Sequence, residues 1–297
     1  PADLGSSPRW GVVGYGHLGS RFLVDRIQRD GPGVGLSLAF VWNRNTDKLT
    51  DSVPDDQILT DLAENADVIV EVCHPHIVKE FGIQFLAHAN FLVGSPSALA
   101  NPQLDQALRL TAKQHGKTLY VPSGALWGGQ DIQRMNDSGS LRALSIRMSK
   151  HPSCFRLGEG LLSDWSEVEG RRVLFHGSVA DLCPIAPNNV NTMAAAAIAA
   201  SALGFHGVAG EIVSDTALAD YHLVEIEVTG LDGFSVKTQR RNPAELGAVT
   251  GRATYRSFWS SLLGRCTSIP SVPVFTKRTA AIHVCRFSTK GVFQALR

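Results

Sequence analysis

Short apolar runs alternate with amphipathic segments over the first 121 residues of the chain. They predict strands at residues 9–13, 36–42, 67–72, 91–94 and 118–121, with helices between them at 20–29, 77–89 and 101–115. The run at 67–72 is apolar at nearly every position, which is typical of a strand buried on both faces of a parallel sheet. This alternation predicts an α/β fold with a doubly wound parallel sheet.

The pattern changes after residue 121. A Gly-rich segment at 122–129 indicates a hinge, and we expect a second domain to start there. Apolar and polar residues alternate at 144–149 and 222–228, as is typical of strands in a sheet with one wetter face. Between these strands the sequence predicts a helix that is capped by an asparagine near residue 188 and ended by Gly204.

A glycine-rich turn directly follows the first predicted strand, with the spacing Gly14-x-Gly16-x-x-Gly19. Gly14 permits a tight turn, Gly16 leaves room for a pyrophosphate, and Gly19 lets the following helix pack closely on the strand. The helix N-terminus would then face the phosphates. We therefore predict a dinucleotide-binding turn, with His17 and Leu18 also in contact with the cofactor.

The residues after the second strand bear on the choice of cofactor. NAD-binding sites usually carry an acidic residue here, but this chain has Asn43 and Arg44. The missing carboxylate and the guanidinium favour NADP, although NAD remains an alternative. Arg44 could also be a solvated loop residue without a role in binding. Cys73 follows the strand at 67–72, where open α/β sheets bind ligands, so we expect it to contact the cofactor. His74 and His76 follow it and are candidates for the nicotinamide half.

Composition narrows the function classes further. With 44% hydrophobic residues, 19% charged residues and a net charge of +1, the chain has no long-range attraction for nucleic acid or anionic membranes. No apolar run is long enough to span a membrane, and fewer than ten residues precede the first strand, so we expect a cytoplasmic protein. The five cysteines are scattered without a C-x-x-C pair, which indicates free thiols and no metal site.

Two features of the second domain are candidates for proton transfer or ligand binding. His222 lies on the same face of its strand as Val224 and Val228, so we expect its side chain to point inward, either as a proton-transfer group or as a core histidine. Three asparagines also lie at the start of the small-residue helix: one would be its cap, and others either read a ligand or satisfy the first turn. The three are Asn188, Asn189 and Asn191.

Taken together, the segments between about residues 8 and 245 resemble the aspartate dehydrogenase family. The resemblance rests on the order and spacing of several short motifs. These are the glycine turn, Ser123-Gly124-Ala125 with Asp131 after it, Lys150 before a proline-containing turn, Phe175-x-Gly177-Ser178, Pro187-x-Asn189-x-Asn191, and the stretch from Asp215 to His222.

The resemblance implies a Rossmann domain at 1–124, a smaller α+β substrate and dimerisation domain at 125–244, and a C-terminal helix at the start of 245–297 that returns to the first domain. It implies that His222 is catalytic, and that Ala125 and an asparagine of the pair Asn189 and Asn191 contact the nicotinamide. The implied reaction is NAD(P)-dependent oxidation of L-aspartate to iminoaspartate, then oxaloacetate and ammonia, in a homodimer. Lys150 is our first candidate for binding the substrate carboxylates.

The chain also departs from the family pattern. Residues 244–246 replace an expected Lys-Thr-Ser, and 264–297 have no recognised counterpart, so we expect either a poorly packed tail or a short element used in dimerisation or partner binding. Two other functions therefore stay open. One is an NADP-dependent imine or aldehyde reductase of another small acid, and the other is a catalytically silent NADP-binding regulator.

Overall fold

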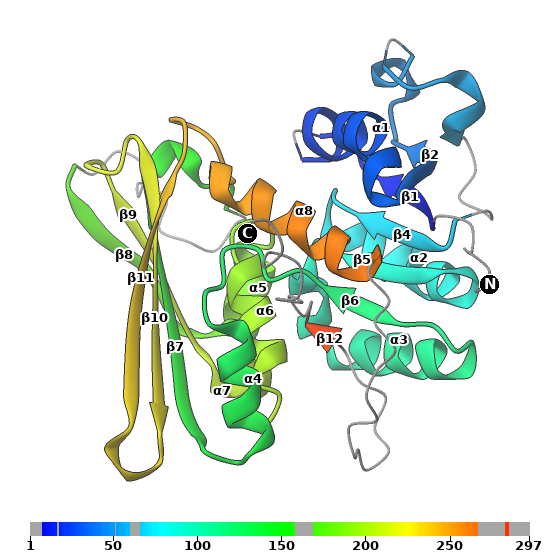
Figure 1. Ribbon diagram of the computed structural model, residues 1–297. Helices are drawn as coiled ribbons and strands as arrows, with labels where there is room; N and C mark the ends of the chain where they lie inside the picture. Colours follow the sequence, from blue (N-terminus) through cyan, green and yellow to red (C-terminus); the bar gives the residue numbers. More distant parts are fainter. Residues whose placement is uncertain are drawn as a thin grey trace, which may run out of the picture.

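The computed structural model describes residues 8–16, 18–50, 52–59, 66–157, 169–266 and 283–284. Two β-sheets organise these residues (Figure 1). The first is a seven-stranded parallel sheet with the order β12-β6-β5-β4-β1-β2-β3. Its strands are β1 Arg9–Val13, β2 Ser37–Trp42, β3 Ile58–Leu59, β4 Val68–Glu71, β5 Asn90–Val93, β6 Leu119–Val121 and β12 His283–Val284.

Helices cover this sheet as the sequence predicts. They are α1 Asp25–Asp30, α2 Pro75–His88 and α3 Pro102–Gln114. The predicted helix at 20–29 is only partly regular, because residues Gly19–Val24 form π-helical turns before α1 begins. Leu23 N–H donates to the Leu18 carbonyl, five residues back. The parallel sheet with its connecting helices confirms the predicted fold class.

The second sheet is mixed, with the order β11-β10-β7-β9-β8, and only the pair β7 and β9 is parallel. Its strands are β7 Leu141–Lys150, β8 Arg171–Ser178, β9 Ala209–Asp215, β10 Tyr221–Gly230 and β11 Ser235–Pro243. One face is covered by helices (Figure 1). They are α4 Gly129–Asp137, α5 Val179–Ile185, α6 Asn191–Ala199 and α7 Gly204–Gly207. The alternation predicted for β10 is confirmed, since His222, Val224, Ile226 and Val228 are all buried.

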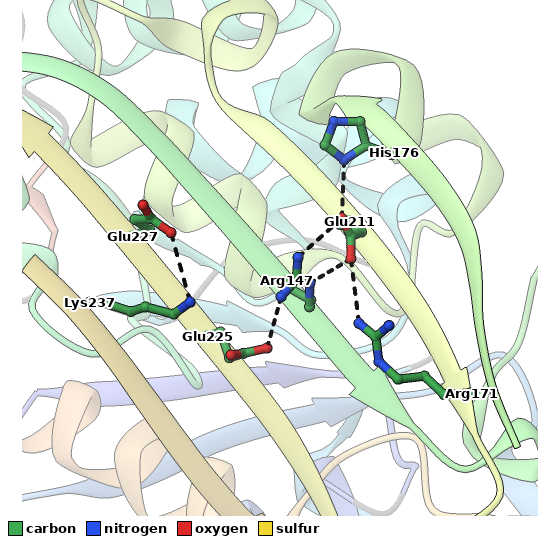
Figure 2. Close-up of polar contacts among 7 residues, drawn as sticks. All are labelled: Arg147, Arg171, His176, Glu211, Glu225, Glu227 and Lys237. Carbon is green, nitrogen blue, oxygen red and sulfur yellow. Dashed lines mark hydrogen bonds and ion pairs between the residues drawn. The ribbon is translucent and has the colours of Figure 1, made fainter.

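The other face of this sheet carries charged side chains (Figure 2). Arg147 on β7 pairs with Glu211 on β9 and Glu225 on β10, and Glu211 also pairs with Arg171 and His176 on β8. Exposed ion pairs of this kind contribute little to stability. Because one face of the sheet is charged and the other is covered by helices, polar and apolar positions alternate along these strands.

The chain returns to the first sheet after β11. Helix α8, Arg252–Cys266, buries Phe258, Trp259 and Leu262 in the same apolar cluster as Trp10 of β1 and Leu23. Nearer the C-terminus, β12 pairs with β6 and so extends the parallel sheet of its own chain. The remainder of 267–297 lies outside the described residues.

Two predictions about α6 are wrong. Its N-cap is Val190, with no side-chain cap, because the Asn189 amide is used elsewhere, as described below. The helix ends at Ala199, and Gly204, in the left-handed conformation, instead begins α7. None of the helices in the described part of the chain has the length and apolar character needed to cross a membrane.

Candidate active site

The glycine turn between β1 and the first helix has the steric properties that its spacing predicts. Gly14 has a φ of 111°, and a Cβ there would lie 2.8 Å from the Cβ of Cys73. A Cβ on Gly19 would lie 1.9 Å from the Gly14 carbonyl oxygen, whereas one on Gly16 would meet nothing within 4 Å. The backbone is therefore closely packed at Gly14 and Gly19 and open at Gly16. His17 lies outside the described residues.

A buried carboxylate fixes the loops beside this turn. Glu71, the last residue of β4, is fully buried and accepts hydrogen bonds from the backbone N–H groups of Cys73, His74 and Ser95 and from the Ser95 hydroxyl. Burial raises the pKa of Glu71, and these hydrogen bonds oppose that shift. Glu71 thereby joins the ends of β4 and β5. In the sequence, Glu71 differs from its neighbours only in being the acidic residue of the apolar run at 68–72.

Residues that follow or belong to the strands of both sheets line one cavity. Many of the predicted site residues meet here although they are far apart in the sequence. They are Leu18, Ala125, Lys150, Asn189, Asn191 and His222. Asn43, Arg44 and Cys73 line a separate cavity together with His74 and His76, so these histidines do not lie beside His222.

Lys150 is the last residue of β7 and is only 3% exposed. Its Nζ donates to the Val249 carbonyl at 2.8 Å and to Asn189 Oδ1 at 3.3 Å. Burial lowers the pKa of Lys150 to about 8. Because an ammonium has three N–H donors, one is left for a ligand in the cavity.

His222 lies near the start of β10 and is also 3% exposed. Its Nε2 is buried without a hydrogen-bond partner among the described residues. Burial, followed by the charge of Lys150, lowers the pKa of His222 to about 3, while a backbone hydrogen bond with Ala248 opposes the shift. The imidazole is therefore neutral at physiological pH, and His222 is one of the residues that line the cavity.

The structure separates the asparagines that the sequence leaves equivalent. Both ends of the Asn189 amide are used by the protein, since Oδ1 accepts from Lys150 and Nδ2 donates to the Arg156 carbonyl. Asn191 lines the cavity, and its Oδ1 is buried without a partner among the described residues. Asn189 thus positions Lys150, whereas Asn191 is available to a ligand.

Asn242 is one of several cavity residues that were not predicted as site residues from the sequence. Asn242, at the end of β11, donates to Thr254 Oγ1 and accepts from the Ala253 N–H, so it fastens the start of α8 over the cavity. The Val249 carbonyl, which accepts from Lys150, comes from the same connection. Neither residue has a sequence signal, because a backbone carbonyl or a lone asparagine in a loop carries no pattern.

The contact between Asn43 and the cofactor stays a prediction, and the structure gives this residue a further role. Its Oδ1 accepts from the Tyr15 N–H and its Nδ2 donates to the Asn45 carbonyl, so the amide links the loop after β2 to the glycine turn. In the described residues, no group of three or more His, Cys, Asp or Glu side chains is arranged to hold a metal ion.

Comparison with known proteins supports the fold and the cofactor class. Residues 14–122 match the NAD-binding domain of homoserine dehydrogenase, and residues 131–261 match the C-terminal domain of aspartate dehydrogenase. In the solved structure of aspartate dehydrogenase from Thermotoga maritima, 91% of this chain matches 99% of that chain, with a TM-score of 0.66 and 19% identity. This likeness extends the agreement in fold to both sheets.

The relatives found by sequence include proteins with a higher identity to this chain. An aspartate dehydrogenase domain-containing protein of Danio rerio is 77% identical over 85% of this chain and 93% of its own length. An L-aspartate dehydrogenase of Methanothermobacter thermautotrophicus is 26% identical over 74% of this chain and 81% of its own. These matches confirm the predicted class, an NAD(P)-dependent amino-acid dehydrogenase. The chain therefore belongs to the family of aspartate dehydrogenase domain-containing proteins.

Proposed function

We propose that this protein catalyses the NAD(P)-dependent oxidative deamination of L-aspartate to iminoaspartate, which hydrolyses to oxaloacetate and ammonia, or the reverse reaction. The observation that carries the proposal is the buried, unpartnered Nε2 of His222 in the same cavity as the buried ammonium of Lys150. The relatives named L-aspartate dehydrogenase, at about a quarter identity over most of the chain, support the choice of substrate.

The residues around the glycine turn fit a dinucleotide. Gly16 leaves space for the pyrophosphate, while Leu18, Ala125 and Asn191 line the cavity on the route to His222. When bound, the nicotinamide supplies a hydride acceptor for the substrate Cα–H as the amine becomes an imine. We assign cofactor contacts to these residues and to Gly14, which shapes the turn.

Lys150 would bind a substrate carboxylate. Below a pH of about 8 its Nζ carries a charge, and two of its three donors are already fixed by Asn189 and Val249. A preorganised ammonium in a buried site binds an anion more strongly than a solvated lysine does. The same charge disfavours protonation of His222, so a bound dicarboxylate would raise the pKa of His222.

His222 would move the protons. The backbone hydrogen bond with Ala248 belongs to the other ring nitrogen, which favours the tautomer with its lone pair on Nε2. Nε2 can then accept a proton from the water that adds to the imine carbon and return it to the departing nitrogen as ammonia leaves. Val224 and Phe258 contribute apolar walls to the same cavity.

The test is turnover of the purified protein, followed by the near-ultraviolet absorbance of the reduced nicotinamide. L-Aspartate is compared with other amino acids in the forward direction, and oxaloacetate plus ammonium with other oxo acids and aldehydes in reverse. Preference for aspartate and oxaloacetate supports the proposal. Preference for another small acid indicates a reductase on the same scaffold, and binding of dinucleotide without turnover on any compound indicates a silent regulator.

The proposal also covers the oligomeric state, the location and the type of substrate of the enzyme. From the family resemblance we propose a homodimer in the cytoplasm, acting on a small molecule and not on nucleic acid. Light scattering on the purified chain should give about twice the 32.0 kDa of one chain. A mass equal to that of a single chain would contradict the dimer.

A further inference from the structure

The second cavity lies between the ends of β2 and β4. It is lined by Trp42, Asn43, Arg44, Cys73, His74, His76 and Ile77. In dinucleotide-binding sheets the ribose of the adenosine is read at the end of the second strand, usually by an acidic residue when the cofactor is NAD. This lining contains no acidic side chain. It carries the guanidinium of Arg44 on one wall and two imidazole rings on the other.

Arg44 is available for a ligand. The guanidinium is exposed and makes no ion pair with the residues that the structure describes. Its neighbour Asn43 is held by the backbone of Tyr15 and Asn45, which fixes the loop that carries Arg44. An arginine on a fixed loop can bind two phosphate oxygens at once.

His74 faces the same cavity with a defined tautomer. Its Nδ1 accepts the N–H of His76 at 3.2 Å and so caps α2, which places the ring proton on Nε2. Its own backbone N–H is bound to the buried Glu71 carboxylate. The backbone of His74 is therefore fixed by Glu71 and its ring by the bond at Nδ1, while Nε2 has no hydrogen-bond partner among the described residues and can donate into the cavity.

We infer that Arg44 and His74 form a two-sided site for a phosphomonoester on the 2′-oxygen of the adenosine ribose, so that this chain selects NADP over NAD by contacts from both walls. Arg44 binds the phosphate from the β2 side, and His74 donates from the β4 side through Nε2. The first turn of α2, which begins at Pro75, adds the positive end of a helix dipole.

The groups around His74 make its contribution depend on pH. Burial, then the charges of His76, Arg44 and Lys79, lower the pKa of His74, and the Cys73 thiol beside it stays protonated with a pKa of about 12. His76 is turned toward the carboxylate of Glu80 on its own helix, at 3.4 Å, and Glu71 is committed to the loop backbone. A bound dianionic phosphate favours the imidazolium, so binding of NADP should take up a proton.

The experiment is calorimetry of the full chain with 2′,5′-ADP and with 5′-AMP, then with NADP and NAD. Two variants remove the proposed contacts. Arg44→Ala deletes the guanidinium, and His74→Asn deletes Nε2 but keeps an oxygen that can cap α2. Lys48→Ala, which removes an exposed lysine outside the cavity lining, is the matched control.

We expect each test variant to bind 2′,5′-ADP and NADP about 10-fold or more weakly, because the variant loses a hydrogen bond to a charged group. The affinities for 5′-AMP and NAD should not change. The Lys48→Ala control should leave all four affinities unchanged. In the wild type, the preference for NADP should increase as the pH falls from about 8 to about 6.5, and His74→Asn should abolish this increase.

An equal loss for phosphorylated and unphosphorylated ligands, or an unchanged preference in His74→Asn, would overturn the inference. The inference depends on dinucleotide binding, which the family match supports, and not on the reaction proposed above. Since every readout is an affinity, failure of the aspartate assay would leave this test unaffected.

Discussion

Replacing Lys150 with methionine separates the energetic cost of this residue from its function. Methionine has nearly the same length and no charge, so it removes a buried ammonium without leaving a large void. We expect Lys150→Met to fold at least as stably as the wild type near neutral pH and to lose turnover of a dicarboxylic substrate. Such a result would mean that the lysine is present for the site and not for the fold.

The magnitude follows from the pKa of Lys150, which falls from 10.5 to about 8 on folding because the side chain is buried. At about 1.4 kcal/mol for each pH unit, keeping the charge in the fold costs about 3 kcal/mol below pH 8. The hydrogen bonds to Asn189 and Val249 return about 1 kcal/mol each. The net gain for the methionine variant is therefore about 1 kcal/mol at neutral pH.

The pH dependence has a definite sign. Between about pH 8 and 10.5 the unfolded chain binds a proton that the native protein has lost, so the contribution of Lys150 to stability rises with pH in that window. From about pH 7 to about pH 9.5 the wild type should gain about 2 kcal/mol relative to the variant.

The assay is urea denaturation of both proteins at the two pH values. Lys237→Met serves as the control, since Lys237 is 60% exposed and should show no such change. A difference between wild type and Lys150→Met that stays within about 0.5 kcal/mol across this range would refute the reasoning. It would mean that the ammonium is solvated in the native state.

Three further predictions concern the residues around the glycine turn. Gly16→Ala should retain the stability of the wild type but weaken dinucleotide binding at least about 10-fold, because its Cβ enters free space that the pyrophosphate needs. Gly19→Ala should destabilise the fold by about 2 kcal/mol or more, because its Cβ would overlap the Gly14 carbonyl. Gly33→Ala is the control and should not destabilise the fold, because its Cβ would meet nothing within 4 Å. Thermal melts measure the stability of the three glycine variants, and calorimetry measures their dinucleotide affinity. Glu71→Gln should cost about 2–3 kcal/mol and loosen dinucleotide binding, because an amide N–H would face groups that all donate to the carboxylate; an unchanged melting temperature would contradict that role.

The sequence predicts the first sheet well because its signals are local. The strands, the helices between them and the glycine turn each follow from a short window of residues, and the inward side of His222 follows from a period of two along β10. These features require no knowledge of what packs against them.

The composition of the cavity was less predictable because it depends on contacts between distant segments. The contact of Asn189 with the cofactor stays a prediction, and no pattern indicated that its amide would bind Lys150, 39 residues away, and the backbone of Arg156. The Val249 carbonyl reaches Lys150 across 99 residues. Such pairings depend on how the connection between β11 and α8 crosses the cavity, which no local pattern records.

The most direct test of the central claim is the turnover number of His222→Asn with L-aspartate, measured with the dinucleotide affinity of the same sample. We predict that turnover falls by about 10²- to 10⁴-fold while dinucleotide affinity is retained, because asparagine cannot accept the proton that Nε2 accepts. Turnover equal to that of the wild type would contradict the account and leave His222 as a buried residue of the core.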